Sequence, residues 1–134
     1  MRCAVEIADS GLQQGQGMHG SFSRADTWNF MAMSGPDFKA GFIDSAPASN
    51  ADLGQTIAHL MAATPASKGK LLGRVLSEAM PGGAMPVVET HVLTSEVGAG
   101  GLRTVIDLQQ VGDTRYFDAA GFPGRTVGLS ASAP

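Results

Sequence analysis

The chain has little of several residue types on which common protein classes depend. Its single cysteine, Cys3, cannot form an internal disulfide, and no Cys/His spacing resembles a closed structural zinc site. Only 16% of its residues are charged, and the formal net charge of −3 gives no basic surface that could neutralise the phosphates of a nucleic acid. We therefore expect neither a disulfide-stabilised module nor a nucleic-acid-binding protein.

Long apolar runs are also missing. No uninterrupted apolar stretch approaches the about 20 residues that cross a bilayer, and the first residues lack the apolar core of an export signal. The chain does have 43% hydrophobic residues, with 18 glycines and 7 prolines spread between periodic segments. This composition predicts a single small domain of 134 residues with one modest core and no membrane partner.

The first part of the chain predicts strands and one helix. Residues 3–7 and 37–43 have the pattern of short strands, the second after a Gly-Pro breaker. The segment from Ser49 to Asp52 has the Ser-x-x-acid form that starts a helix. The helix that follows is amphipathic, with an apolar stripe and a solvated polar stripe. The apolar stripe consists of Leu53, Ile57, Leu60 and Met61, and the polar stripe consists of Asp52, Gln55, Thr56 and His59.

The second part changes to β character. Within residues 70–80 we expect only a short helix near the end, before Pro81-Gly82-Gly83. Residues 87–97 and 102–111 are typical of strands, and Gly112-Asp113 fits a two-residue hairpin turn. The pattern as a whole predicts an α/β fold that ends in a small antiparallel unit.

His19 is the residue with the strongest case for chemistry. It lies in a glycine-rich stretch and is followed by Gly20, close to the hydroxyl of Ser21 and to Arg24. A neutral imidazole can bind zinc, and a following glycine lets the backbone approach a crowded metal centre. The residues alone leave open that His19 is an ordinary hydrogen-bonded loop histidine.

Three segments follow one another in a particular order: the His19-Gly20 pair, the strand expected after Gly35-Pro36, and the helix start from Ser49 to Asp52. In this order they resemble the C-terminal part of the type I phosphodiesterase and nucleotide pyrophosphatase branch of the alkaline phosphatase superfamily. The similarity covers about residues 3–80. It implies that residues 1–80 are the C-terminal portion of an alkaline-phosphatase-like α/β sandwich. Residues 81–134 would be a β-hairpin extension of the same domain.

The resemblance also implies a function. Such enzymes hydrolyse small phosphoester substrates at a site with two zinc ions, and His19 would be a ligand of one of them. They are often exported, which implies an exported or periplasmic location. Sulfatase-like relatives share the strand-and-helix ending, so a sulfate ester stays open as the substrate.

The chain departs from the family pattern in what precedes His19. The relatives carry their nucleophile and other zinc ligands upstream of this histidine, and here only eighteen residues precede it. A catalytic zinc needs three protein ligands. We therefore expect a C-terminal fragment of a metal-dependent phosphoester hydrolase, inactive alone and without catalytic residues of its own. Its partner would be the missing N-terminal portion of the same enzyme.

Four residues near His19 are candidates for a supporting or substrate-binding role: Gly20, Ser21, Arg24 and Asp26. Asp26 could orient His19 by accepting a hydrogen bond from its second ring nitrogen, or it could be a turn or cap residue. Arg24 could face a substrate phosphate, or it could pair with Asp26 on the surface.

A second interpretation belongs to another class of protein. The chain could be a small non-catalytic α/β binding or interaction module that uses its hairpin tail. An exposed sheet edge would then favour strand addition by a partner, or self-association.

Overall fold

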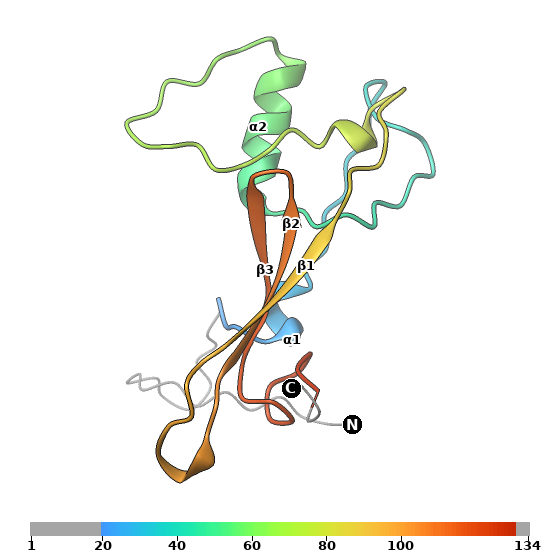
Figure 1. Cartoon of the computed structure of the whole chain (residues 1–134). Helices are drawn as coiled ribbons and strands as arrows, with labels where there is room; N and C mark the ends of the chain where they lie inside the picture. The colour runs from blue at the N-terminus through green and yellow to red at the C-terminus, as the bar shows by residue number, and fades with distance from the viewer. Residues whose placement is uncertain (1–19, 131–134) are drawn as a thin grey trace, which may run out of the picture. The chain divides into compact units, whose positions relative to one another are not determined.

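The computed structural model describes residues 20–130 and has a small mixed α/β fold (Figure 1). Three strands form one antiparallel sheet in the order β1-β2-β3. The elements are α1 (Arg24–Thr27), α2 (Asn50–Leu60), the 3-10 helix η1 (Ser77–Ala79), β1 (Glu89–Thr94), the 3-10 helix η2 (Ala99–Gly101), β2 (Val105–Val111) and β3 (Thr114–Gly121). The α/β class is confirmed, and the alkaline-phosphatase-like sandwich stays a prediction.

The C-terminal hairpin forms as expected. β2 and β3 are joined by Gly112 and Asp113, and Gly112 has a φ of 55°, in the left-handed region that glycine adopts without strain. The expected strand 3–7 lies outside the described residues.

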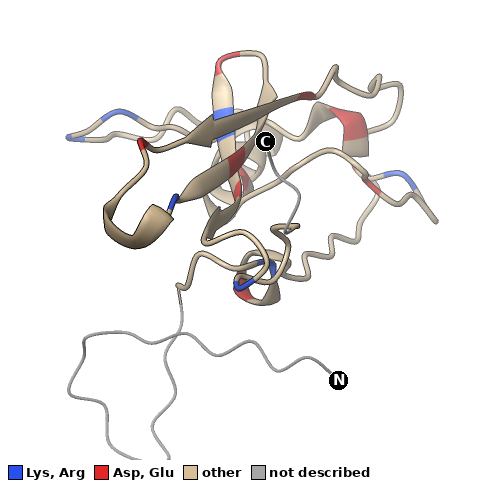
Figure 2. Ribbon diagram, turned by 60° about the horizontal axis from the view of Figure 1, so that its bottom comes forward, with Lys and Arg blue, Asp and Glu red and all other residues tan. Residues whose placement is uncertain are grey.

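The chain clusters into two compact units, which we call the β unit and the helix unit. Within the described residues, the β unit contains 20–30, Thr90–Leu108 and 117–130, and the helix unit contains Met31–Glu89 and Gln109–Tyr116. The β unit has a small apolar core in which Val105, Ala119 and Leu129 are buried together. In Figure 2 charged residues are scattered along the ribbon, and no element carries a run of basic residues.

The predicted strand at 37–43 is wrong, because this segment forms turns. Phe38 donates its amide to the Gly35 carbonyl, and Gly41 has a φ of 64°, far from the values of a regular strand. The Lys39 amide bonds to the carbonyl of Ala79, next to η1, at 2.9 Å. The alternation of phenylalanines therefore reflected two side chains of a turn, not one face of a sheet.

The short helix expected near the end of 70–80 is confirmed as η1. The residues before it form no regular element, and Gly73 lies directly against the first turn of α2, where a Cβ atom would be 2.2 Å from the Ala51 carbonyl oxygen. This close approach explains why a glycine interrupts the apolar pattern. Leu76 is buried, whereas Leu71 and Leu72 are exposed.

The helix predicted after Ser49 is confirmed as α2. Ser49 and Asp52 form a capping box, and the Ser49 amide donates to Asp52 Oδ2 at 2.7 Å. Asp52 is thus a cap residue, one of the roles that its position predicted. Among the described residues no helix is both long and apolar enough to cross a membrane.

The side of α2 that is buried is not the one that its stripes predict. Asp52 and Thr56, from the polar stripe, have no exposed surface. The apolar stripe is on the outside: Leu53 and Leu60 are 37% exposed, Ile57 is 47% exposed and Met61 is 72% exposed. At about 100° per residue, the apolar stripe lies roughly a third of a turn away from the buried side. His59 is exposed, as expected.

Candidate functional site

Of the candidate site residues that follow His19, the structure describes all four, beginning with Gly20. His19 lies just outside the described residues, so its role as a zinc ligand stays a prediction. Gly20 has a φ of 83°, which favours glycine at this position. The Ser21 amide donates to Asp26 Oδ2, and the Ser21 and Ser23 hydroxyls are 3.4 Å apart. These contacts close a tight loop in front of α1, with Asp26 as its acceptor.

Arg24 is held by a residue that sequence reasoning did not consider. Its Nε donates to Asp118 Oδ1 at 2.9 Å and its Nη2 donates to Asp118 Oδ2, so the guanidinium and the carboxylate form a two-point ion pair. The hydrogen bond to Asp118 raises the pKa of Arg24, against the opposing effect of burial. Asp118 is nearly buried, whereas a third of the Arg24 side chain is exposed. Arg24 is therefore a structural clamp between α1 and β3.

Further contacts fasten α1 to the end of the chain within the β unit. Thr27 Oγ1 donates to the carbonyl of Asp118 at 2.6 Å, and the Arg24 amide donates to the Val127 carbonyl at 2.9 Å. Gly128 leaves room for the Arg24 stem, since a Cβ atom there would approach that side chain to 2.7 Å. Ser21 and Asp26 are therefore in contact, whereas the Arg24 guanidinium pairs with Asp118 on β3 and not with Asp26.

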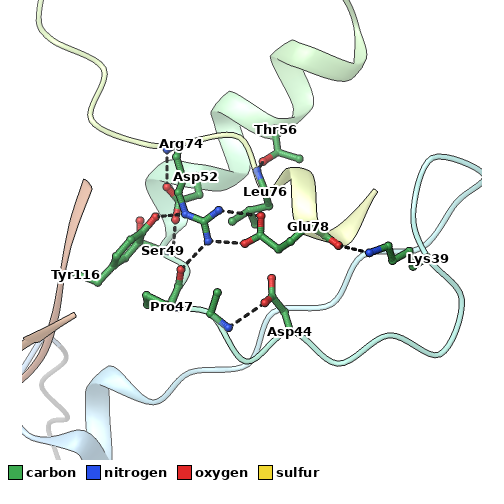
Figure 3. Close-up of polar contacts among 11 residues, drawn as sticks. Lys39, Asp44, Pro47, Ser49, Asp52, Thr56, Arg74, Leu76, Glu78 and Tyr116 are labelled. Atoms are coloured by element: carbon green, nitrogen blue, oxygen red, sulfur yellow. Dashed lines mark hydrogen bonds and ion pairs between the residues drawn. The ribbon is translucent and has the colours of Figure 1, made fainter. Parts of the chain in front are cut away.

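The helix unit contains the densest cluster of ionisable groups, centred on Arg74 (Figure 3). Arg74 Nη1 and Nη2 donate to the two oxygens of Glu78, Nε donates to the Tyr116 hydroxyl at 2.7 Å, and Nη2 also donates to the Pro47 carbonyl at 3.0 Å. Glu78 is 1% exposed. One guanidinium therefore joins η1, the start of β3 and the loop before α2.

The pKa values of this cluster follow from burial and from Arg74. Burial raises the pKa of Asp44, and the negative charge of Glu78 adds to the increase. Burial also acts to raise the pKa of Glu78, but the hydrogen bonds and the positive charge of Arg74, together with a backbone hydrogen bond and one from Asp44, outweigh it and lower this pKa. Burial raises the pKa of Tyr116 to about 12, with a further contribution from Asp52. Tyr116 therefore stays protonated at neutral pH.

The polar stripe of α2 also belongs to this cluster, because its side chains accept hydrogen bonds from backbone amides of the neighbouring segment 74–76. Asp52 Oδ1 accepts the Arg74 amide at 2.7 Å, and Thr56 Oγ1 accepts the Leu76 amide at 3.0 Å (Figure 3). Without Thr56 the buried Leu76 amide would have no acceptor, and without Asp52 the partly buried Arg74 amide would lose its own, which is unfavourable. This requirement turns the polar stripe inward and leaves the apolar stripe outside.

The Arg74 cluster has the character of a structural centre. Among residues 20–130, every buried side-chain nitrogen and oxygen already has a hydrogen-bond partner. The cluster therefore has no unpartnered buried side-chain atom that would bind a ligand. The spacing of Arg74 and Glu78, four residues apart, is the one sequence signal that could have pointed to it.

The described residues do not provide a zinc site by themselves. Between residues 20 and 130, no three His, Cys, Asp or Glu side chains lie close enough together to hold a metal ion. A catalytic zinc needs three protein ligands. A zinc centre that includes His19 therefore requires donors from outside this part of the chain.

Comparison of the chain with protein-family models, with curated proteins and with solved structures gives no match. The functional argument therefore depends on the residues and on the geometry described above.

Proposed function

We propose that this chain is the C-terminal section of a metal-dependent phosphoester hydrolase and that it contributes His19 to a zinc site completed by another polypeptide. The observation that carries the proposal is the order of three segments in the sequence: the His19-Gly20 pair, the strand expected after Gly35-Pro36, and the helix start from Ser49 to Asp52. The second segment forms turns in place of the expected strand. The third segment forms a capped helix, α2, at the expected position. This agreement supports the resemblance at the third segment.

Supporting roles for the loop after His19 agree with this proposal. Asp26 closes the loop through the Ser21 amide, and Arg24 anchors the following turn on Asp118. In the proposed zinc site, this loop would support the ligand that precedes it, as the residues around metal ligands commonly do. Two of the five guanidinium N–H donors of Arg24 are committed to Asp118. We therefore give Arg24 a positioning role, not that of a phosphate ligand.

The proposal is tested by extending the reading frame upstream of the Met1 codon and producing the extended chain. We expect zinc-dependent hydrolysis of bis-p-nitrophenyl phosphate or p-nitrophenyl phosphate, with p-nitrophenyl sulfate as the test of the sulfatase-like alternative. His19→Ala should lower the rate by about a hundredfold or more, since even residues that only support metal ligands contribute 10–100-fold. The matched control is His59→Ala, because His59 is exposed on α2.

Two outcomes would contradict this function. One is a frame closed by a stop codon directly upstream, and the other is a His19→Ala variant as active as the unmodified enzyme. Zinc binding by the 134-residue chain alone should be weak, because one imidazole is a single donor.

The interaction module is the second candidate, and one observation favours it. The outer face of α2 is apolar and exposed in a chain whose described residues hold no metal cluster. A folded chain whose circular dichroism and size-exclusion behaviour do not change with zinc, and whose upstream frame encodes no metal ligands, would support this candidate over the hydrolase.

A further inference from the structure

We propose that residues 61–72, which follow α2, are a site of proteolytic cleavage by a lysine-specific serine protease, and that the two chains produced by the cut stay joined. The cut follows Lys68 or Lys70. We call residues 61–72 the lysine loop, and in Figure 1 it is the yellow-green loop that leaves the end of α2. Neither His19 nor zinc takes part in this cleavage.

The lysine loop lies outside the core along its whole length. All of its residues are exposed. Leu71 and Leu72 are 47% and 68% exposed, so apolar contacts do not hold the loop either. A protease needs to take several residues of its substrate into a cleft, and a segment without buried side chains can enter that cleft without unpacking the protein.

Hydrogen bonds do not tie the lysine loop to the rest of the described chain. The Ala63 amide makes the last bond to α2, at 2.9 Å, and the next bond to the helix comes from the Arg74 amide. Between these two points, in residues 64–72, the described hydrogen bonds join Ser67 to Gly69 within the loop itself. Opening this segment for cleavage therefore breaks no contact with the folded part of the chain.

The sequence explains why no regular element forms here. Ala62, directly after the C-cap of α2, has a φ of 50°, the left-handed conformation that ends many helices. Pro65 has no amide hydrogen for a helix, and Gly69 loses more conformational freedom on ordering than other residues do. Exposed loops of small and polar residues are the preferred positions of proteolytic nicking.

The specificity for lysine comes from a comparison of the chain's three lysines, Lys39, Lys68 and Lys70. The Lys39 amide donates to the Ala79 carbonyl at 2.9 Å, and its Nζ donates to two further carbonyl oxygens at 2.9 and 2.7 Å. These bonds must break before Lys39 can enter the acidic pocket of a protease. Lys68 and Lys70 make no such bonds with the described residues.

Cleavage is the hydrolysis of one peptide bond. The oxygen of a water molecule bonds to the carbonyl carbon of Lys68 or Lys70, and the C–N bond to Gly69 or Leu71 breaks. The two protons of the water end on the released amine. The products are a lysine carboxylate and a new N-terminal ammonium group, and the protease is regenerated.

Contacts in the helix unit join the two sides of the cut. Asp52 and Thr56, before the lysine loop, accept the amides of Arg74 and Leu76, after it, at 2.7 and 3.0 Å. Because Asp52 and Thr56 have no exposed surface, water does not readily replace these bonds.

Contacts in the β unit do the same. Arg24 forms its two-point ion pair with Asp118, and the Ala120 amide donates to the Phe22 carbonyl at 2.6 Å. Each unit is thus built from segments on both sides of the lysine loop. We therefore expect one folded protein made of two chains.

The test is digestion of the 134-residue chain with a lysine-specific endoprotease at low concentration, followed by mass spectrometry of the denatured products. We expect cuts after Lys68 and Lys70 to be at least about tenfold faster than a cut after Lys39. Cleavage follows the population of the open form, and opening at Lys39 breaks three hydrogen bonds. Lys68→Gln combined with Lys70→Gln should remove the rapid cuts.

Arg103→Lys is the matched control, because it places a lysine at an exposed position in a paired segment. The neighbouring carbonyls of Leu102 and Thr104 accept backbone amides at 2.8 and 3.0 Å. This lysine should be cut at least about tenfold more slowly than those of the loop. If the variant loses the circular dichroism spectrum of the unmodified chain, Arg125→Lys replaces it, since Arg125 is exposed and its amide donates to the Phe122 carbonyl.

Size-exclusion chromatography without denaturant measures whether the two chains stay joined. We expect the cut protein to elute as one peak at the volume of the intact chain, with its far-ultraviolet circular dichroism retained. Resistance to cleavage, or cleavage at Lys39 or at the control lysine as fast as in the loop, would overturn the proposal. So would rapid cleavage of the double glutamine variant, or fragments that elute separately.

Discussion

Replacing Thr56 by valine tests directly which side of α2 faces the core. Thr56 Oγ1 accepts the Leu76 amide at 3.0 Å, and both residues are almost completely buried. Valine has nearly the same shape but no acceptor, so the amide is left buried without a partner. Such a loss costs about 1–3 kcal/mol. Because threonine and valine are both β-branched, their helix propensities nearly cancel. We expect the free energy of unfolding to fall by about 2 kcal/mol.

The neighbouring residue supplies a control with the reverse exchange. Ile57→Thr removes apolar surface from a side chain that is 47% exposed. We therefore expect the free energy of unfolding to fall by only ~0.5 kcal/mol, as is typical of surface positions. If the apolar stripe faced the core, as its spacing predicts, Ile57→Thr would remove a buried aliphatic group and would lower the free energy of unfolding by more. The decrease would then exceed about 1.5 kcal/mol.

Urea unfolding followed by far-ultraviolet circular dichroism measures both changes. With a slope of about 2 kcal/mol per molar urea, Thr56→Val should lower the midpoint by about 1 M, and Ile57→Thr should lower it by about a quarter of that. A larger loss in Ile57→Thr than in Thr56→Val would refute the inward orientation of the polar stripe.

Two further predictions concern other contacts. Arg24→Lys keeps the charge but loses the two-point contact with Asp118. We therefore expect the free energy of unfolding, measured in urea, to fall by about 1–2 kcal/mol. The control Arg125→Lys, at an exposed position, should stay within about 0.5 kcal/mol, and equal losses in the two variants would contradict the clamp. Tyr116 is the only tyrosine, so the ultraviolet absorbance of tyrosinate reports its pKa alone, with an expected midpoint of about 12 in place of 10. Because this acid has a raised pKa in the folded state, its contribution to stability is complete below about pH 10 and is lost as the pH rises toward 12. A midpoint near 10 in the folded chain would be inconsistent with its burial.

Local signals in the sequence determined the elements whose geometry depends on a few neighbouring residues. The Ser49 to Asp52 capping box started α2, and Gly112-Asp113 turned the hairpin between β2 and β3. Both are short-range effects, because a hydroxyl, a carboxylate or a glycine acts on amides within three or four residues.

Alternation of apolar residues was a weaker guide. At 37–43 it predicted a strand, but the segment contains Gly41 in a left-handed conformation and bonds through Lys39 to the carbonyls of Glu78 and Gly83. The resulting turns depend on residues about forty positions later in the chain, which no local pattern contains.

The sequence by itself thus determined that α2 and the hairpin exist. The order of its segments also carries the resemblance to a hydrolase. Only the tertiary structure decided which side of α2 is buried, because the amides of Arg74 and Leu76 needed acceptors and Asp52 and Thr56 supplied them. It also decided that Arg24 pairs with Asp118, ninety-four residues away. Buried hydrogen-bonding groups must be satisfied wherever the chain brings them together, and that requirement outweighed the apolar stripe of the helix.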